Sequence, residues 1–273
     1  MKGILFTILS LTSIAVAEPL TREYASFDSG PLNIDIHYPT KERESLAPLI
    51  LWIHGGGWQQ GSRENMNLIA WVTLHGYAIA SIDYRLTNIA PFPAQLDDCR
   101  AALGWIRKNG RNHRLDPSRI VVSGFSAGAH LATLLTVSQG DDEAPLQGFI
   151  HFYGPSDLNQ MARYATKPSD PLNQPDSNVY KLLAGPLMDC LELAKEASPV
   201  TYLDAGDPSC LILVGDEDTL MTQRQCKRLH EAALAAEIPS EFHLVPGAGH
   251  GGKAFSDPER RKLILKFLTS ALP

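Results

Sequence analysis

The sequence lacks any run of lysine and arginine longer than the three residues Arg260-Arg261-Lys262, and its 273 residues carry a formal net charge of -6. Proteins that bind nucleic acid usually present a basic patch, so we do not expect a nucleic-acid partner. The cysteines are few, and their spacing matches neither a metal site nor a dense disulfide framework. They are Cys99, Cys190, Cys210 and Cys226. Cys190 with Cys210 is the only pair that we consider for a disulfide, and the sequence leaves this pairing open.

The apolar stretch that follows Lys2, "GILFTILSLTSIAV", is too short to span a bilayer comfortably, because a span takes roughly 20 apolar residues. It runs into Ala15-Val16-Ala17 before Glu18. A positively charged start, a short apolar core and an A-x-A cleavage site are typical of a secretory signal peptide. We therefore expect residues 1–17 to be removed and the protein to be exported, to the periplasm or beyond, without a transmembrane anchor. The alternative is a buried first strand or helix.

No internal repeat, low-complexity segment or linker divides residues 18–273, so we expect a single domain. Short apolar runs alternate with helical patterns, which predicts an α/β fold with a mostly parallel central sheet and helices on both faces. Strands are predicted at 32–38, 47–54, 76–84, 119–125, 146–154, 209–215 and 240–246, and helices at about 65–75, 94–109, 127–137, 222–237 and 257–270. The segment 155–200 is proline-rich with weak periodicity, which is typical of an inserted lid or binding wall, or of a plain surface excursion.

A possible nucleophile lies where a buried strand meets a helix, in "RIVVSGFSAGAHLATLL". Gly124-Phe125-Ser126-Ala127-Gly128 reads G-x-S-x-G, and the turn is so tight that a side chain at either glycine would collide with backbone. The start of the following helix favours negative charge near Ser126. This pattern predicts that Ser126 is a nucleophile.

A triple glycine follows the strand 47–54, in "HGGGW", residues 54–58. Its N–H groups are uncovered and can hydrogen-bond a developing oxyanion at the carboxyl edge of the sheet, where ligands bind. His54 is expected to brace this turn. Trp58 is either a wall of the substrate pocket or a packing residue.

A serine nucleophile needs a base, and the base needs an orienting acid. Among nine histidines, His250 lies in a glycine-rich loop after the last strand, "VPGAGHGG", and is predicted to be the base. Asp216, Glu217 and Asp218 follow the preceding strand, giving the chain order Ser-Asp-His that is typical of α/β-hydrolases. Position alone does not choose between the two aspartates.

The chain resembles the α/β-hydrolase esterases of the hormone-sensitive-lipase-like group, and more closely the bacterial carboxylic ester hydrolases that include feruloyl and acetylxylan esterases. The matching text is "WIHGGGWQQGS", "SIDYRLTNIAPFPAQLDDCRAALGWIR", "GFSAGAHLATLL", "FYGPSDL", "ASPVTYL" and "VPGAGHGG". This resemblance implies an α/β-hydrolase fold. It selects Asp218 as the acid, and it implies an oxyanion hole from the N–H groups of Gly56, Gly57 and Ala127. Tyr153, in "FYGPSDL", is with Trp58 a candidate for the substrate pocket.

The sequence departs from the family pattern in three respects. Val214 stands where the family has a histidine before the acid loop, and Met221 and Thr222 replace its valine-proline pair. Ala129 stands where a second glycine is common after Ser126. None of these changes removes a catalytic group, but the first two affect the expected shape of the acid loop.

The expected function is hydrolysis of carboxylic esters through a Ser-His-Asp triad and an acyl-enzyme, which requires neither a metal nor an organic cofactor. The resemblance implies short or aromatic acyl groups, acetyl or feruloyl, on a small ester or an acylated saccharide of the plant cell wall. The alternatives are a serine peptidase or formamidase on the same scaffold, and an inactive binding module. The sequence does not indicate an oligomeric state.

Overall fold

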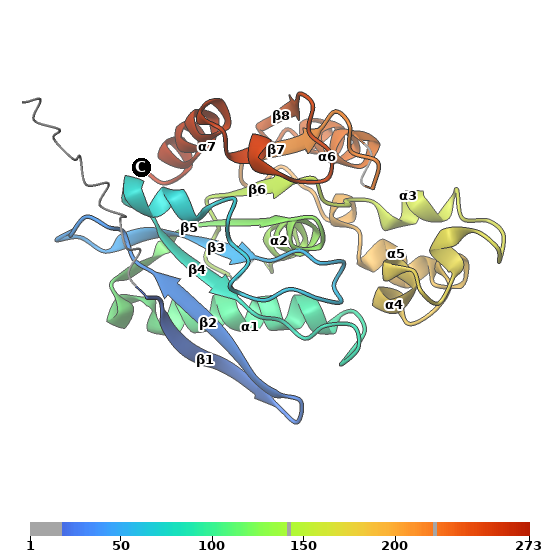
Figure 1. Ribbon diagram of the computed structural model, residues 1–273, viewed down its shortest axis with the longest axis horizontal. Coiled ribbons are helices and arrows are strands. Elements are labelled where there is room, and N and C mark those ends of the chain that lie inside the picture. The colour runs from blue at the N-terminus through green and yellow to red at the C-terminus, as the bar shows by residue number, and fades with distance from the viewer. Residues whose placement is uncertain (1–17, 141–142, 221–222) are drawn as a thin grey trace, which may run out of the picture.

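The computed structural model describes residues 18–140, 143–220 and 223–273. Their strands form one eight-stranded sheet in the order β1-β2-β4-β3-β5-β6-β7-β8 (Figure 1). The strands are β1 (Leu20–Phe27), β2 (Gly30–His37), β3 (Ala47–Ile53), β4 (Ala78–Ile82), β5 (Leu115–Phe125), β6 (Gly148–Phe152), β7 (Cys210–Gly215) and β8 (Ser240–Val245). β2 runs antiparallel to both of its neighbours, and all the other neighbouring pairs are parallel.

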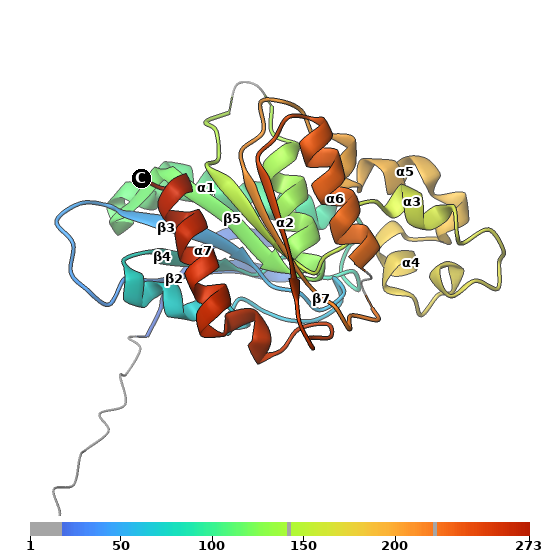
Figure 2. The same ribbon diagram turned by 90° about the horizontal axis from the view of Figure 1, so that it is seen from above.

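The centre of the sheet is buried on both faces, as the near-continuous apolar runs predict. Along β3, Leu49 and Leu51 join a core with α1 (Ala94–Asn109) and α2 (Ala127–Val137). Ile50 and Trp52 join the opposite core, with α7 (Pro258–Ala271) and a 3₁₀ helix, η1 (Ala70–His75). Figure 2 shows α7 crossing the near face of the sheet. The helix α6 (Gln223–Ala235) packs against β7 and β8. Helices therefore cover both faces, as expected.

The predicted helix at 65–75 is wrong in type. Residues 65 and 66 are irregular, residues 67–69 form a turn, and only η1 is helical. Three buried apolar side chains are spaced by three residues, at Met66, Ile69 and Val72. The N–H groups of Ile69 and Val72 donate to carbonyls three residues back, at 3.0 and 2.9 Å. A spacing of three suits the 3₁₀ helix, which has three residues per turn.

The segment 155–200 folds into short helices rather than one long cover. They are α3 (Leu158–Ala162), α4 (Asn178–Leu183) and α5 (Leu191–Glu196), with 3₁₀ turns at Pro171–Asn173, Leu187–Asp189 and Pro199–Thr201. Figure 1 shows α3, α4 and α5 together beyond α2, at one end of the molecule. Leu158, Leu182 and Leu187 are fully buried in the core that α1 and α2 share. Helices this short explain the weak periodicity.

All four cysteines are free thiols, so Cys190 and Cys210 do not form a disulfide in this structure. Residues 1–17, Met221 and Thr222 lie outside the described residues, so the signal peptide and the effect of the Met221-Thr222 pair on the acid loop stay predictions. No helix in the described part of the chain is both long and apolar enough to cross a membrane.

Candidate active site

The sequence-predicted residues meet at the carboxyl edge of the sheet. β3 leads into the triple-glycine loop, β5 into Ser126, β6 into Tyr153, β7 into Asp218 and β8 into His250. Because these five strands are parallel neighbours, their carboxyl ends lie at the same edge of the sheet. Residues distant in the sequence are brought together in this way.

Ser126 occupies a strained turn between β5 and α2. Its backbone has φ 53° and ψ -122°, a conformation that costs a non-glycine residue about 1–3 kcal/mol. The Ser126 N–H donates to the Phe152 carbonyl at 2.9 Å, which ties the turn to β6. A Cβ on Gly124 would lie 2.5 Å from the Ile53 oxygen, and one on Gly128 only 2.1 Å from it. Both glycines are therefore required by close approach to β3.

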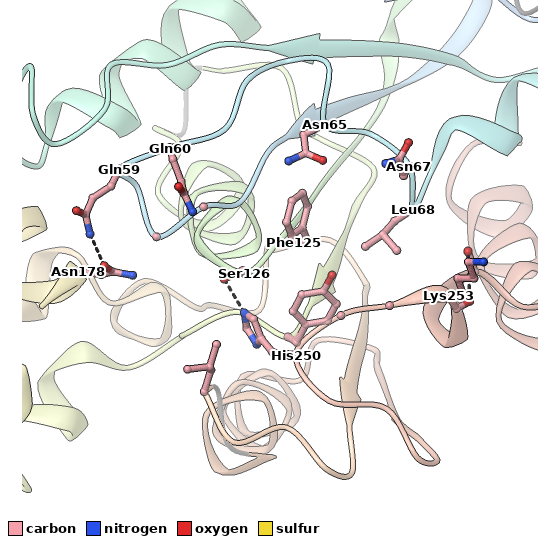
Figure 3. Close-up of a pocket in the computed structure, with 17 residues that line it drawn as sticks. Gln59, Gln60, Asn65, Asn67, Leu68, Phe125, Ser126, Asn178, His250 and Lys253 are labelled. Atoms are coloured by element: carbon pink, nitrogen blue, oxygen red, sulfur yellow. Dashed lines mark hydrogen bonds between the residues drawn. The ribbon is translucent and has the colours of Figure 1, made fainter.

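A chain of hydrogen bonds joins Asp218, His250 and Ser126. His250 Nε2 lies 2.9 Å from Ser126 Oγ, and His250 Nδ1 lies 2.8 Å from Asp218 Oδ2 (Figure 3 shows the bond to Ser126). A carboxylate only accepts, so Nδ1 carries the proton and Nε2 is free to accept the serine proton. The Asp218 side chain is fully buried, and its Oδ1 accepts from the Leu220 N–H at 2.9 Å.

Asp216 has a different place. Its Oδ1 accepts a hydrogen bond of 2.7 Å from the Gly247 N–H, in the loop that leads to His250. Asp216 therefore braces this loop, and Asp218 is the aspartate that contacts the imidazole. The aspartate next to His250 is thus the one that the family resemblance selects, and its role as the acid stays a prediction.

The candidate oxyanion groups flank Ser126. Gly56 and Gly57 have φ values of 111° and 62°, and both line the cavity that contains Ser126. The N–H groups of Gln59 and Gln60 donate to the Gly56 carbonyl at 3.1 and 3.2 Å, which closes this loop into a tight turn. Ala127 is the first residue of α2, so its N–H has no carbonyl partner within the helix.

His54 supports the same loop from below, as the sequence suggests. Its ring stacks on Tyr84 with 4.3 Å between centroids, and the Tyr84 hydroxyl donates to the His54 carbonyl at 3.0 Å. Burial lowers the pKa of His54, so its imidazole stays neutral. A neutral, buried ring is suited to packing rather than to proton transfer.

Of the two residues proposed for the substrate pocket, Trp58 and Tyr153, only Tyr153 lines the cavity. Trp58 does not line the cavity: the left-handed turn through Gly56, Gly57 and Trp58 buries its side chain, which meets the His130 ring edge-on at 5.3 Å. The pocket-wall expectation for Trp58 is thus wrong, and the packing alternative holds.

Tyr153 does line the cavity, and its ring lies 4.9 Å from that of His250. Burial, with a smaller contribution from the Asp218 charge, raises the pKa of the Tyr153 hydroxyl, so the hydroxyl stays protonated. Tyr153 therefore offers the cavity an aromatic ring with a permanent hydrogen-bond donor.

Two buried histidines lie beneath the site. Burial lowers the pKa of His130 and of His151 to about 4. His151 Nε2 lies 2.9 Å from the Gly154 carbonyl oxygen and 3.1 Å from the Gly154 nitrogen, and its Nδ1 lies 2.8 Å from Thr133 Oγ1. His130 Nε2 donates to the Ala197 carbonyl at 2.6 Å. Both rings are neutral: His151 links α2 to β6, and His130 links α2 to the end of the segment 155–200.

Sequence reasoning missed most of the cavity wall. The cavity measures about 1000 Å³, and no aspartate or glutamate is found among the described residues that line it. The missed residues are Gln59, Gln60, Asn65, Asn67, Leu68, Phe125, Asn178, Leu220, Lys253 and Ser256 (Figure 3). They come from separate loops, the end of β5, α4 and a 3₁₀ helix at Lys253–Ser256, so no periodic pattern marks them. No cluster of three or more His, Cys, Asp or Glu side chains that could hold a metal occurs in the described ranges.

Comparison with known proteins gives a consistent answer. The family described as BD-FAE matches residues 34–233, which is well over half of the chain. The carboxylesterase NlhH of Mycobacterium tuberculosis (strain CDC 1551 / Oshkosh) is 26% identical over 224 residues, covering 78% of this chain and 70% of NlhH.

Two solved structures extend the comparison. A truncated carbohydrate esterase from gut microbiota superposes with a TM-score of 0.78 at 24% identity, covering 94% of this chain and 98% of that one, which supports the fold alone. A bifunctional GH43-CE protein of Bacteroides eggerthii gives a TM-score of 0.79 at 26% identity, covering 92% of this chain and 35% of that one. The chain therefore belongs to the BD-FAE family and is an α/β-hydrolase carboxylesterase.

Proposed function

We propose that this carboxylesterase removes short or aromatic acyl groups, acetyl or feruloyl, from an acylated saccharide by means of a Ser126-His250-Asp218 triad. The observation that carries the proposal is the hydrogen-bond chain from Asp218 through His250 to Ser126, which opens into a cavity lined by carboxamides as well as aromatic and aliphatic side chains. This arrangement of donor and acceptor atoms suits nucleophilic catalysis by a serine.

In the proposed mechanism, His250 Nε2 takes the proton from Ser126 Oγ as the hydroxyl attacks the ester carbonyl carbon. The carbonyl oxygen becomes an oxyanion, which accepts hydrogen bonds from the N–H groups of Gly56 or Gly57 and of Ala127. The alcohol leaves with the proton from His250, and water then cleaves the acyl-enzyme by the same steps. Asp218 holds Nδ1–H and stabilises the imidazolium that forms.

The wall of the cavity supports the substrate class. Carboxamides at Gln60, Asn65 and Asn67 can both donate to and accept from the hydroxyls of a saccharide. Phe125 and Tyr153 offer ring faces for an aromatic acyl group.

The test compares the protein with its Ser126→Ala variant on an acetylated methyl glycoside, methyl ferulate and 4-nitrophenyl acetate. We expect Ser126-dependent hydrolysis of the acetyl ester on the glycoside, and of at least one of the other two esters. Cleavage of acetate without ferulate would restrict the acyl group to a short one. Equal rates for wild type and variant would contradict the proposed nucleophile, and complete inactivity of both would favour a binding module.

We also propose that residues 1–17 are a signal peptide and that the protein is exported. The support is the positively charged Lys2, the apolar stretch after it and the Ala15-Val16-Ala17 sequence. Mass spectrometry of the protein recovered from the periplasm or medium should give an N-terminus at Glu18. An intact Met1 on exported protein would contradict cleavage.

A further inference from the structure

Three polar side chains tie the candidate oxyanion loop to α4. Lys181 Nζ donates to Gln59 Oε1 at 2.7 Å, and Gln59 Nε2 donates to Asn178 Oδ1. Gln59 lies in the loop after β3, whereas Asn178 and Lys181 lie three residues apart on α4. The segment 155–200 is thus joined to the loop that carries Gly56 and Gly57.

The direction of both hydrogen bonds is fixed by the charge at one end. An ammonium group can only donate, so the atom of Gln59 that faces Lys181 must be its carbonyl oxygen. The amide nitrogen of Gln59 is then the atom that faces Asn178, and Asn178 must present Oδ1 to it. The remaining polar atom of Asn178 is Nδ2, which can only donate.

This donor lies beside the candidate oxyanion loop. A Cβ built on Gly57 would lie 2.1 Å from Asn178 Nδ2, so the amide nitrogen packs directly against this glycine. Asn178 lines the same cavity as Ser126 and His250. Figure 3 shows Asn178 beside Gln59, at the opposite end of the cavity from Lys253.

We propose that Asn178 Nδ2 donates a hydrogen bond to a substrate oxygen beside Gly57, and that Gln59 and Lys181 are positioning residues that keep Asn178 in this orientation. The inference rests on the proposed function, because it requires an ester bound at Ser126. The substrate oxygen is either the ester carbonyl oxygen or a hydroxyl of the alcohol. Both oxygens accept hydrogen bonds. An ester whose alcohol carries other hydroxyls and an ester without them distinguish the two cases. The segment 155–200 thereby acts as a wall of the site.

The decisive variants are Asn178→Ala and Asn178→Asp, assayed on 4-nitrophenyl acetate and on a monoacetylated methyl glycoside. The alanine variant removes the donor, and kcat/KM should fall about tenfold, the effect of one hydrogen bond. The aspartate variant should be at least as poor, because an acceptor oxygen then faces an acceptor on the substrate. A loss on both esters identifies the carbonyl oxygen, and a loss on the glycoside alone identifies a hydroxyl.

Thermal unfolding separates this role from a structural one. In Asn178→Asp the new carboxylate can still accept from Gln59 Nε2, and it lies within one helical turn of Lys181. Its unfolding midpoint should therefore equal or exceed that of the wild type, although its kcat/KM is lower. A purely structural role also predicts retained stability in the aspartate variant, but together with a wild-type kcat/KM.

Lys181 provides a second test, because in the proposal it orients Asn178 through Gln59 without contacting the substrate. Lys181→Met frees the Gln59 amide to rotate, so kcat/KM should fall several-fold, and Lys181→Arg should restore it, since guanidinium also only donates. Lys227→Met, at an exposed α6 lysine paired with Glu231, controls for the loss of one positive charge. It should leave kcat/KM unchanged.

Wild-type kcat/KM in Asn178→Asp on both esters would overturn the proposal. Equal losses of kcat/KM and of unfolding midpoint in both Asn178 variants would overturn it as well. Ser126→Ala is measured in the same series: if it matches the wild type, the proposed function fails, whereas a failure confined to Asn178 leaves Ser126-dependent hydrolysis intact.

Discussion

The two sides of the site are held together by different forces. At the sheet edge, backbone atoms are in contact: Gly128 leaves no room for a Cβ against the Ile53 carbonyl, and the Ser126 N–H is bonded to β6. In the segment 155–200, hydrogen bonds from buried side chains hold the backbone in place. Asn173 Nδ2 donates to the carbonyls of Ala165 and Lys167, at 2.9 and 2.8 Å.

The difference predicts where the molecule tolerates change. A backbone contact allows one side chain or none, whereas a side-chain contact can be replaced by another of similar polarity. We therefore expect the nucleophile side of the cavity to be intolerant of substitution, and the wall from α4 to be the side on which substrate preference can vary.

The largest effect should come from the acid of the triad. Asp218→Asn should lower kcat about 10⁴-fold, because the amide favours the wrong imidazole tautomer. Asp216→Asn, which alters only the brace at Gly247, should lower kcat less than tenfold. Steady-state kinetics on 4-nitrophenyl acetate measures both, and a more damaging Asp216→Asn would reverse our assignment of the acid.

Next in size is the packing of the turn. Gly128→Ala should reduce the free energy of unfolding by about 3 kcal/mol and abolish activity, because the new methyl overlaps backbone atoms of β3. Gly104→Ala is the matched control: it lies within α1 with nothing near its Cβ, so it should stabilise the protein by about 0.5–1 kcal/mol. Urea unfolding tests both, and equal stability of the two variants would contradict the comparison.

A fall in pH should reduce the free energy of unfolding through the protonation of His151, which lies beneath Ser126. The pKa of His151 is about 4 in the folded chain, and an unfolded histidine has about 6.5, so the unfolded state binds more protons between these values. The neutral His151 therefore destabilises nothing above about pH 6.5. At pH 5 its preferential protonation in the unfolded state should reduce the free energy of unfolding by about 2 kcal/mol. Asp207 acts in the opposite direction, because burial raises its pKa to about 6.

The measurement isolates His151 from other groups by comparing pH 7 with pH 5 in wild type and in His151→Gln. The decrease in the free energy of unfolding should be about 2 kcal/mol smaller in the variant. The same decrease in both proteins would show that His151 is not the group being protonated.

The smallest effect is expected at Trp58. Its Nε1 is buried without a hydrogen-bond partner among the described residues, so Trp58→Phe loses ring area but also removes an unpaired donor. We expect a stability change of about 1 kcal/mol or less and an unchanged KM. A fivefold rise in KM would show instead that Trp58 contributes to substrate binding.

These regions also differ in how well the sequence predicts them. The bounds of α2, 127–137, agree with the predicted helix because a glycine turn and an apolar run mark its start. β1 was not predicted, since most of its side chains are exposed or half-buried and leave no alternation. Asn178 was also missed, because its place depends on Gln59 and Lys181 rather than on a local pattern.

The burial of the thiols has a consequence for chemical durability. A cysteine is oxidised or alkylated as its thiolate. Burial raises the pKa of Cys210 to about 12 and also raises that of Cys99 and Cys226, so at neutral pH these three stay protonated and enclosed. Only Cys190 is partly exposed. The molecule should therefore keep its shape and activity in reducing and oxidising surroundings alike, with Cys190 as the one thiol that reports the difference.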